Sequence, residues 1–440
     1  MTAEIVLMNR ESIAIAADSA VSLMGGQTES PQKIFTSANK IFDLSPAHSI
    51  CFMIFNYASF MGIPWGIIFT QYRKKIKNST FATTEEYAKN FIDFLANEED
   101  LVPPEGEENY FMTNSYHYFL SIKQSIMQNA SDLVKTSGGI TEKDVMNVPA
   151  STIQGLYDNL IAAPYATSMT EEDFTRLQIT YDEKLTQAIT DVFEALPLSE
   201  TSVTQLKAIA ALYFVKSAGT LDSLSQDFSG VVIAGFGEKD IFPSLVAYWI
   251  EGRLNKKLKY TEKKNTKISF KNGAEIVPFA QHEMVDIFLS GMDSAFEEAL
   301  LHSIAATLYT YPEAMIESIE ELSDEMKAKY KSTFQVNTDE IVKNLTEELN
   351  NYRMSNFIPI INVVVALPKS ELAAMAESLV NLTSLKRRVS MQAETVGGPV
   401  DVAVISKTDG FVWIKRKQYY PADLNPSPQV PPQEETCHEG

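Results

Sequence analysis

Three short stretches near the amino terminus decide the fold predicted for this chain: MTAEIVL at residues 1–7, SIAIAADS at 12–19 and NKIFDL at 39–44. Apolar and small residues alternate along the first two stretches, which predicts a β-hairpin. The third stretch and the apolar run at 49–55 predict a second hairpin. Because strand side chains alternate between two faces, Thr2 and every second residue after it share one face of the first strand.

Thr2 carries the most chemical meaning in these stretches. It is small enough for Met1 to be removed ahead of it, which leaves a threonine whose hydroxyl can attack while its free α-amine acts as general base. Asp18 ends the predicted second strand and Lys40 begins the third, so an acid and a lysine are expected to meet beside Thr2. Taken singly, the residues have plain explanations, namely a routine Met-Thr start and a structural ion pair. Together they predict a catalytic site.

This arrangement resembles the β subunits of the proteasome and their bacterial relatives in the N-terminal nucleophile (Ntn) hydrolase superfamily. In that family the mature chain begins with threonine, an acid follows sixteen residues later, and a lysine opens a strand of the form Lys-Ile-Phe-x-Leu. Here Asp18 follows Thr2 by sixteen residues, and Lys40 opens the matching strand after a loop that is longer than usual. The family's closing hairpin and central strand resemble GGPVDVAVISKTDG at 397–410 and GVVIAGFG at 230–237.

The resemblance implies an α+β fold, a four-layer αββα Ntn-hydrolase sandwich of two mainly antiparallel sheets between helical layers. Strands from both ends of the chain should share its core. One domain is expected over residues 1–420, with an inserted helical subdomain at about 100–225 and extra helices at about 300–350, because both helical stretches exceed what the family needs. Residues 421–440 are rich in prolines and acids, which is typical of a disordered tail.

The resemblance also implies a function. The protein would be a bacterial, homo-oligomeric hydrolase that cleaves peptide or other amide bonds, with Thr2 as nucleophile and its α-amine as base. Lys40, kept positive by Asp18, would lower the pKa of the hydroxyl and of the amine by its charge. A backbone N–H near the end of the strand at 50–55 would hold the tetrahedral oxyanion. Lys33 stands at the family's usual count but inside a Gly/Ser/Thr-rich loop, so Lys40 is preferred.

The chain also departs from the family pattern. The family usually has glycine where Phe55 or Asn56 stands, and its supporting Gly-Ser-Gly and Asp-x-x-Ser are replaced by AEI at 274–276 and AETV at 393–396. In the second of these, Glu394 and Thr395 are chemically apt but one residue out of register. The departures leave an alternative function, a catalytically inactive proteasome-like scaffold whose insertion binds partners. A generic α/β protein with an accidental amino-terminal match is a third interpretation.

Composition limits the partners of this 440-residue chain. Its formal net charge of −20 argues against a nucleic-acid-binding surface, because phosphate affinity depends on clustered Lys and Arg. No apolar run reaches the ~20 residues that a membrane span needs, and the amino terminus lacks the layout of a secretory signal. Two cysteines and five scattered histidines provide neither a disulfide framework nor a metal-ligand spacing. We therefore expect a cytoplasmic protein that needs no metal and no cofactor, and the resemblance implies that its substrate is a peptide or another amide.

The remaining elements follow from periodicity and turn residues. The pattern is almost wholly helical from about 109 to 225 and from about 280 to 350, and residues 98–108 read as an acidic loop broken by proline. The apolar run at 358–366 is either a strand or the buried end of a helix. Helix starts are expected at Thr141, at Thr170 and near Pro278. Further strands are predicted at 229–236, 244–251, 266–270, 400–406 and 411–416, and a further helix at 369–388.

Overall fold

The computed structural model describes residues 3–24, 31–139, 141–194, 196–217, 228–389 and 396–418. Thr2, Glu394, Thr395 and the tail at 421–440 lie outside these described residues. The chain forms two compact units, Met1–Ile41 with Ile268–Gly440 and Phe42–Lys267. Each unit contains helices and one five-stranded antiparallel sheet, so the fold is of the α+β kind.

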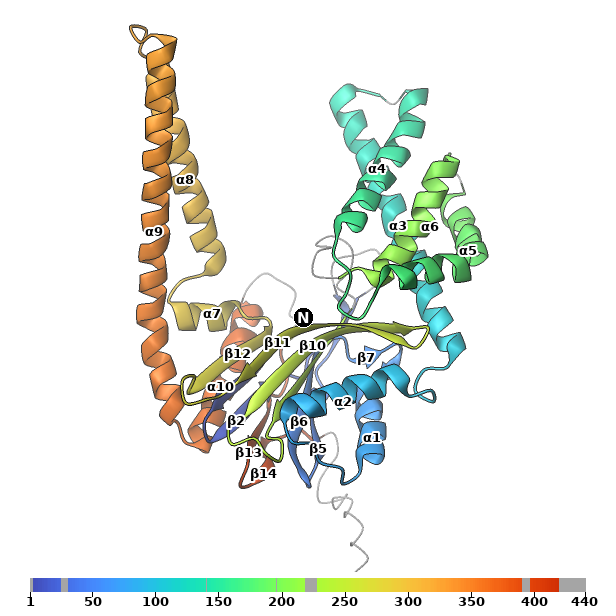
Figure 1. The fold of residues 1–440 in the computed structure, drawn as a ribbon, viewed down its shortest axis with the longest axis vertical. Coiled ribbons are helices and arrows are strands. Elements are labelled where there is room, and N and C mark those ends of the chain that lie inside the picture. Colours follow the sequence, from blue (N-terminus) through green and yellow to red (C-terminus); the bar gives the residue numbers. More distant parts are fainter. Residues whose placement is uncertain are drawn as a thin grey trace, which may run out of the picture. The chain divides into compact units, whose positions relative to one another are not determined.

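The sheet of the first unit joins strands from both ends of the chain (Figure 1). β2 (Ser12–Ala17) lies between β1 (Ala3–Asn9) and β13 (Asp401–Ser406), with β12 (Ala274–Ala280) and β14 (Gly410–Lys415) at the two edges. The register places Ala14 opposite both Leu7 and Val404. Every residue of β1, β2 and β13 is buried. The predicted sharing of one core by the amino-terminal strands and the closing strand is confirmed.

Helix α10 (Lys369–Val389) covers one face of this sheet. Its apolar side chains alternate with helical period, and Leu372 and Ala376 are fully buried against small and branched residues of β1, β2 and β13. Burying a side chain of the size of Leu372 contributes about 1.5–3 kcal/mol. Packing against α10 therefore fixes which face of each strand points toward this helix. Glu4 lies on the other face of β1.

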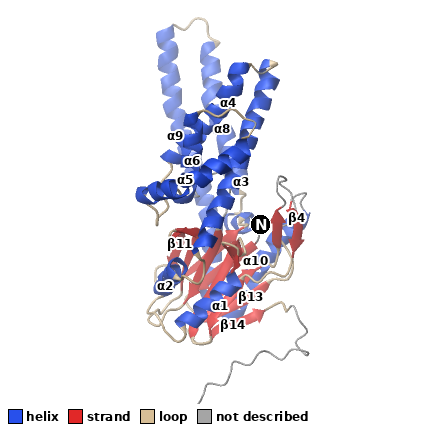
Figure 2. Ribbon diagram, turned by 90° about the vertical axis from the view of Figure 1, so that its right-hand side faces the viewer, coloured by secondary structure: helices blue, strands red, loops and turns tan. Residues whose placement is uncertain are grey.

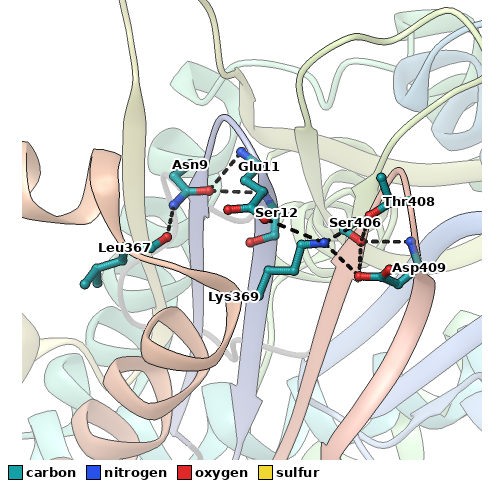
Figure 3. A network of polar contacts seen from close by, with 8 residues as sticks. All are labelled: Asn9, Glu11, Ser12, Leu367, Lys369, Ser406, Thr408 and Asp409. Carbon is teal, nitrogen blue, oxygen red and sulfur yellow. Dashed lines mark hydrogen bonds and ion pairs between the residues drawn. The ribbon is translucent and has the colours of Figure 1, made fainter.

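A polar network closes the turn between β1 and β2 (Figure 3). The Asn9 side chain accepts hydrogen bonds from the amides of Glu11 and Ser12 and donates one to the carbonyl of Leu367, at 2.9–3.1 Å. Lys369 Nζ binds the Asp409 carboxylate at 2.7 Å. The turn therefore ties the hairpin to the start of α10 and to the β13–β14 connection, at the end of the sheet away from the first residues of β1.

The sheet of the second unit has the order β11 (Lys257–Lys267), β10 (Ser244–Leu254), β9 (Ser229–Gly235), β6 (His48–Asn56) and β5 (Ile41–Ser45). The predicted hairpin of β5 and β6 is confirmed. Helices α1 (Trp65–Ile76) and α2 (Thr84–Asn97) pack on this sheet through an aromatic cluster that includes Phe52, Trp65, Phe69 and Phe91. Short strands complete the described β-structure: β3 (Val21–Met24), β4 (Pro31–Phe35), β7 (Ser59–Phe60) and β8 (Ile63–Pro64).

Three predictions of local structure were wrong: one strand, one helix start and one loop. The strand predicted at 266–270 is the end of a much longer β11, which a run of lysines and polar residues hides from a periodicity argument. The helix start predicted near Pro278 is instead part of β12, an edge strand that tolerates proline because one of its sides needs no hydrogen bonds. Helix α7 begins at Glu283. Lys33 lies in β4 rather than in a loop, although its side chain is outside the described part.

Four helices occupy the predicted insertion: α3 (Pro104–Ser137), α4 (Glu142–Ala162), α5 (Glu171–Phe193) and α6 (Glu200–Val215) (Figure 2). They share a core in which the rings of Phe111 and Tyr181 stack at 4.2 Å. The predicted helix starts are confirmed, because Thr141 and Thr170 both form capping boxes. The acidic loop is shorter than predicted, because α3 begins at Pro104. Glu107 therefore lies in α3, where its carboxylate forms an ion pair with Arg253.

The second helical stretch comprises α7 (Glu283–Ser290), α8 (Ser294–Glu317) and α9 (Asp324–Ala366). The run at 358–366 is the end of α9, where Val364 is fully buried, so the helical alternative was the right one. Within the described residues, no helix is both long and apolar enough to cross a membrane.

The buried Asp240 carboxylate should make the stability of the second unit depend on pH. Burial by itself raises the pKa of this carboxyl, but Lys267 at 2.7 Å and the amides of Thr84 and Gly237 at 2.9–3.0 Å hold the pKa below its ordinary value. Asp240→Asn is expected to lower the free energy of unfolding by about 1–3 kcal/mol at pH 7. Because the folded pKa is the lower one, the wild-type advantage is complete above the unfolded pKa of about 3.9 and is lost as pH falls through the folded pKa.

Urea unfolding of both proteins between pH 7 and pH 3 measures this difference. The exposed Asp93 on α2 is the matched control, and Asp93→Asn should leave stability unchanged. A difference for Asp240→Asn that grows as the pH falls would contradict the assigned direction.

Candidate functional site

Three charged side chains meet where the first strands begin and end. Glu4 lies on β1 opposite Ala17, Asp18 directly follows β2, and Lys40 directly precedes β5. Lys40 Nζ lies 3.0 Å from Glu4 Oε1 and donates a hydrogen bond to Asp18 Oδ1. The side chain of Lys40 is 4 % exposed, and those of both acids are 0 % exposed. One ammonium is therefore held between two carboxylates in a site closed to solvent.

Backbone amides fix the Asp18 carboxylate. Its Oδ1 accepts a hydrogen bond from the Ala3 amide at 3.1 Å, and its Oδ2 accepts from the amides of Gly397 at 2.9 Å and Ala20 at 3.3 Å. A carboxylate with several amide donors is stabilised in its charged form. Asp18 thus connects Lys40, the first residue of β1 and the segment before β13.

The Gly-Gly pair before β13 is needed for this connection. Gly398 has φ +79°, in the left-handed region that glycine favours, and a Cβ at this position would lie 2.8 Å from Thr36 Cβ. Beside it, Ser19 donates from its amide to Gly397 O at 3.2 Å and from its hydroxyl to Pro399 O at 2.5 Å. A larger residue would push the segment away from the Asp18 carboxylate.

The charge balance of the site is unusual. Glu4 and Asp18 together carry two negative charges and Lys40 carries one positive charge, so the three groups sum to −1 if all are ionised. Removing charges from water costs several kcal/mol for each ion, which close pairing and hydrogen bonds must offset. In this site the compensation includes the contacts of Lys40 with both acids and the amide donors of Asp18.

The sequence predictions for these residues divide into three outcomes. The predicted contact between Asp18 and Lys40 is confirmed, while a catalytic role for either stays a prediction. Thr2 lies outside the described residues, so its distance from Lys40 also stays a prediction, and with it the comparison with Lys33. Glu4 was missed as a site residue. The sequence contained a signal that could have identified Glu4. It stands two residues after Thr2, on the same face of an otherwise apolar strand.

The strand expected to carry the oxyanion amide ends in the second unit at Asn56. Asn56 has φ +67°, a conformation that asparagine tolerates better than most residues and that glycine adopts freely. Its side chain donates to Phe228 O at 2.8 Å. The Phe55 ring lies over Gly230, where an added Cβ would come within 2.1 Å of it. Asn56 is therefore accommodated by its backbone conformation, and the Phe55 ring by the missing side chain of Gly230.

Other buried reactive groups have structural surroundings. Burial raises the pKa of the Cys51 thiol, which makes it a poor nucleophile. Lys216 has a pKa lowered by burial, and its Nζ donates to Ala163 O at 2.7 Å and lies 3.9 Å from the centre of the Tyr165 ring. Lys259 donates to Tyr213 O at 2.9 Å and pairs with Glu251. Across the described ranges, no three His, Cys, Asp or Glu side chains are grouped so as to hold a metal ion.

Comparison with known proteins gives no family for this chain. No protein-family model matches the sequence, and no curated protein matches it significantly. The site must therefore be interpreted from its own geometry and from the sequence pattern that surrounds it.

Proposed function

We propose that this protein is an N-terminal threonine hydrolase that cleaves peptide or other amide bonds after removal of Met1. The observation that carries the proposal is the buried Lys40 ammonium between Glu4 and Asp18, with Asp18 also bound to the amide of Ala3. Ala3 is the residue that follows Thr2, so the chain that carries the hydroxyl and the α-amine leads directly into this site. Buried charges are costly unless they are well paired or used, and an ammonium next to a nucleophile has a use.

The architecture supports the proposal that residues 1–420 form one Ntn-type sandwich. Each unit supplies one five-stranded antiparallel sheet. Helix α10 covers the sheet of the first unit, and α1 and α2 cover the sheet of the second. In the proposed arrangement, the two sheets are the inner layers and these helices belong to the outer layers.

In the proposed reaction, Thr2 Oγ attacks the carbonyl carbon of the amide while the free α-amine takes the hydroxyl proton. The amine then returns this proton to the leaving nitrogen, the carbon–nitrogen bond breaks, and an ester on Thr2 remains. Water, deprotonated by the same amine, hydrolyses the ester and restores the hydroxyl. The charge of Lys40 stabilises the alkoxide that develops on Oγ. Glu4 and Asp18 hold the ammonium in place, and Glu4 offsets part of its charge.

A catalytically inactive scaffold is the second candidate, and the charge balance of the site favours it. With two carboxylates on one ammonium, the positive charge available to activate Thr2 is reduced, as in a purely structural ion network. The two candidates differ in whether Thr2 reacts.

The decisive experiment combines intact mass with labelling. Purified full-length protein should lack Met1, and a peptide epoxyketone, which reacts with both the hydroxyl and the amine of an amino-terminal threonine, should add once, at Thr2. Thr2→Ala should abolish labelling while circular dichroism stays unchanged. The exposed Thr80 is the matched control, and Thr80→Ala should label as the wild type does. If protein with a proven free Thr2 is never labelled by a series of such electrophiles, the hydrolase proposal falls and the scaffold takes its place.

A further inference from the structure

Helices α8 and α9 form an antiparallel hairpin that projects from its own sheet (Figure 1). Three contacts define the seam between them. Glu297 pairs with Arg353 near the base, Thr338 Oγ1 donates to Leu308 O at 3.3 Å in the middle, and Lys331 Nζ binds Glu317 at 2.5 Å near the tip. Residues 294–317 and 324–366 are all described, so the whole surface of this hairpin can be assigned.

Large apolar side chains form an exposed stripe along each helix, next to the seam. At 3.6 residues per turn, the five residues of the α9 stripe fall within an arc of about 80°. The four residues of the α8 stripe fall within an arc of about 100°. Each of the nine side chains is between 37 and 64 % exposed. The α8 stripe comprises Phe296, Leu300, Tyr311 and Met315, and the α9 stripe comprises Met326, Tyr330, Phe334, Ile341 and Tyr352.

Both stripes lie on the same broad side of the hairpin. Viewed down either helix from its N-terminus, a clockwise turn leads from the stripe to the seam. Because the two helices run antiparallel, this order places both stripes on the same side of the hairpin. The hydrogen bond between Tyr309 and Asp339 marks the other side, which is mostly polar but also carries the exposed Val336 and Met354. We call the nine side chains the apolar face. Side chains on the opposite side include Glu298, His302, Glu313, Ser332, Gln335, Lys343, Thr346 and Asn350.

The apolar face has the composition of the centre of a protein interface. It is rich in aromatic residues and methionine, and within the two described helices the charged residues inside its arcs are Glu348 and Glu297, of which Glu297 is buried and paired with Arg353. Interface centres are depleted in charge and enriched in these residue types. A two-helix hairpin has no further layer of its own to cover such a face, and exposed apolar patches beyond a few hundred Å² mark interaction sites.

We propose that the apolar face binds the same face of a second copy of this chain, so that two hairpins form a four-helix bundle around a two-fold axis. Nine large side chains about half exposed correspond to roughly 900 Å² per copy, taking about 200 Å² for each residue. A stable interface of standard size needs about 800 Å² per partner. A two-fold interface uses one patch on both copies, and the nine side chains carry no charge that would repel their counterparts on the second copy. Facing hairpins also give every helix the two neighbours of a four-helix bundle.

The test compares two double variants of the full-length chain by sedimentation equilibrium. Tyr311→Glu with Phe334→Glu places two charges on the apolar face. His302→Glu with Gln335→Glu adds the same two charges on the opposite side and is the matched control. Wild type and control should dimerise with dissociation constants within about 3-fold of each other, and the face variant at least about 100-fold more weakly, as expected for unpaired charges in an interface. Tyr311→Gln with Phe334→Gln is an uncharged second variant, which should weaken the dimer at least about 10-fold.

Three results would overturn the proposal. Wild-type protein that remains monomeric at 100 µM would exclude a second copy, and binding of such a monomer to phosphatidylcholine vesicles would assign the face to lipid. A dimer that both face variants leave unchanged would place the interface elsewhere. Equal weakening by the face and control variants would show that the effect is a general one of added charge.

Discussion

Lys40→Met is expected to lower the free energy of unfolding by about 3–5 kcal/mol, the cost of removing one partner of a buried ion cluster. Methionine fills much of the volume of the lysine side chain but leaves Glu4 and Asp18 facing each other without the ammonium between them. Asp18 keeps its three amide donors, so part of the charge of this carboxylate stays compensated. The same variant should also lose labelling at Thr2, because the proposed reaction needs the positive charge.

Urea unfolding at pH 7 measures the stability effect. Lys89→Met is the matched control, because Lys89 pairs with Glu85 on the exposed surface of α2 and its replacement should leave the stability close to that of the wild type. Adding Glu4→Gln to Lys40→Met should recover part of the lost stability, since it removes one of the two negative charges that then face each other. A loss for Lys40→Met no larger than for Lys89→Met would show that the ammonium is not needed by the two acids.

Arg253→Met should destabilise the second unit by a comparable amount, about 3–5 kcal/mol. The Arg253 side chain is 3 % exposed, and its Nε donates to Glu107 at 2.8 Å. Its remaining N–H groups donate to the carbonyls of Leu95, Glu98 and Val102. These carbonyls belong to the last turn of α2 and the connection to α3, where helix geometry leaves acceptors without partners. One guanidinium therefore caps α2 and positions the first turn of α3.

Arg253→Lys separates charge from geometry. Lysine keeps the charge but lacks the planar fork of five donors, so it should recover less than half of the stability lost in Arg253→Met. The exposed Arg176, which pairs with Glu172 on α5, is the control, and Arg176→Met should cost less than about 0.5 kcal/mol. Full recovery by lysine would show that charge alone matters at this position.

Part of this molecule could be predicted from the sequence because the signals are local. The alternation of residues 3–8 and 12–18 matches β1 and β2, and Thr141 and Thr170 mark helix starts through hydrogen bonds to residues three positions away. The contact of Asp18 with Lys40 could be predicted because both residues stand at strand ends. β2 and β5 pair in different sheets, however, so the contact is made by the two side chains and not by strand pairing.

The sequence alone therefore determined the type and the ends of those helices and strands whose signals are local. These signals are the spacing of apolar residues and the capping residues, which act over only a few positions. The edge strands β11 and β12 were missed or mistaken because an edge strand is defined by backbone hydrogen bonds to its neighbour, and its side chains are free to be polar or proline. Glu4 and Arg253 needed the tertiary structure, since their meaning depends on groups that packing brings close: Lys40 for Glu4, and Glu107 with the end of α2 for Arg253. A charge in an apolar strand becomes part of a site only when burial removes water from it, and burial is decided by the fold as a whole.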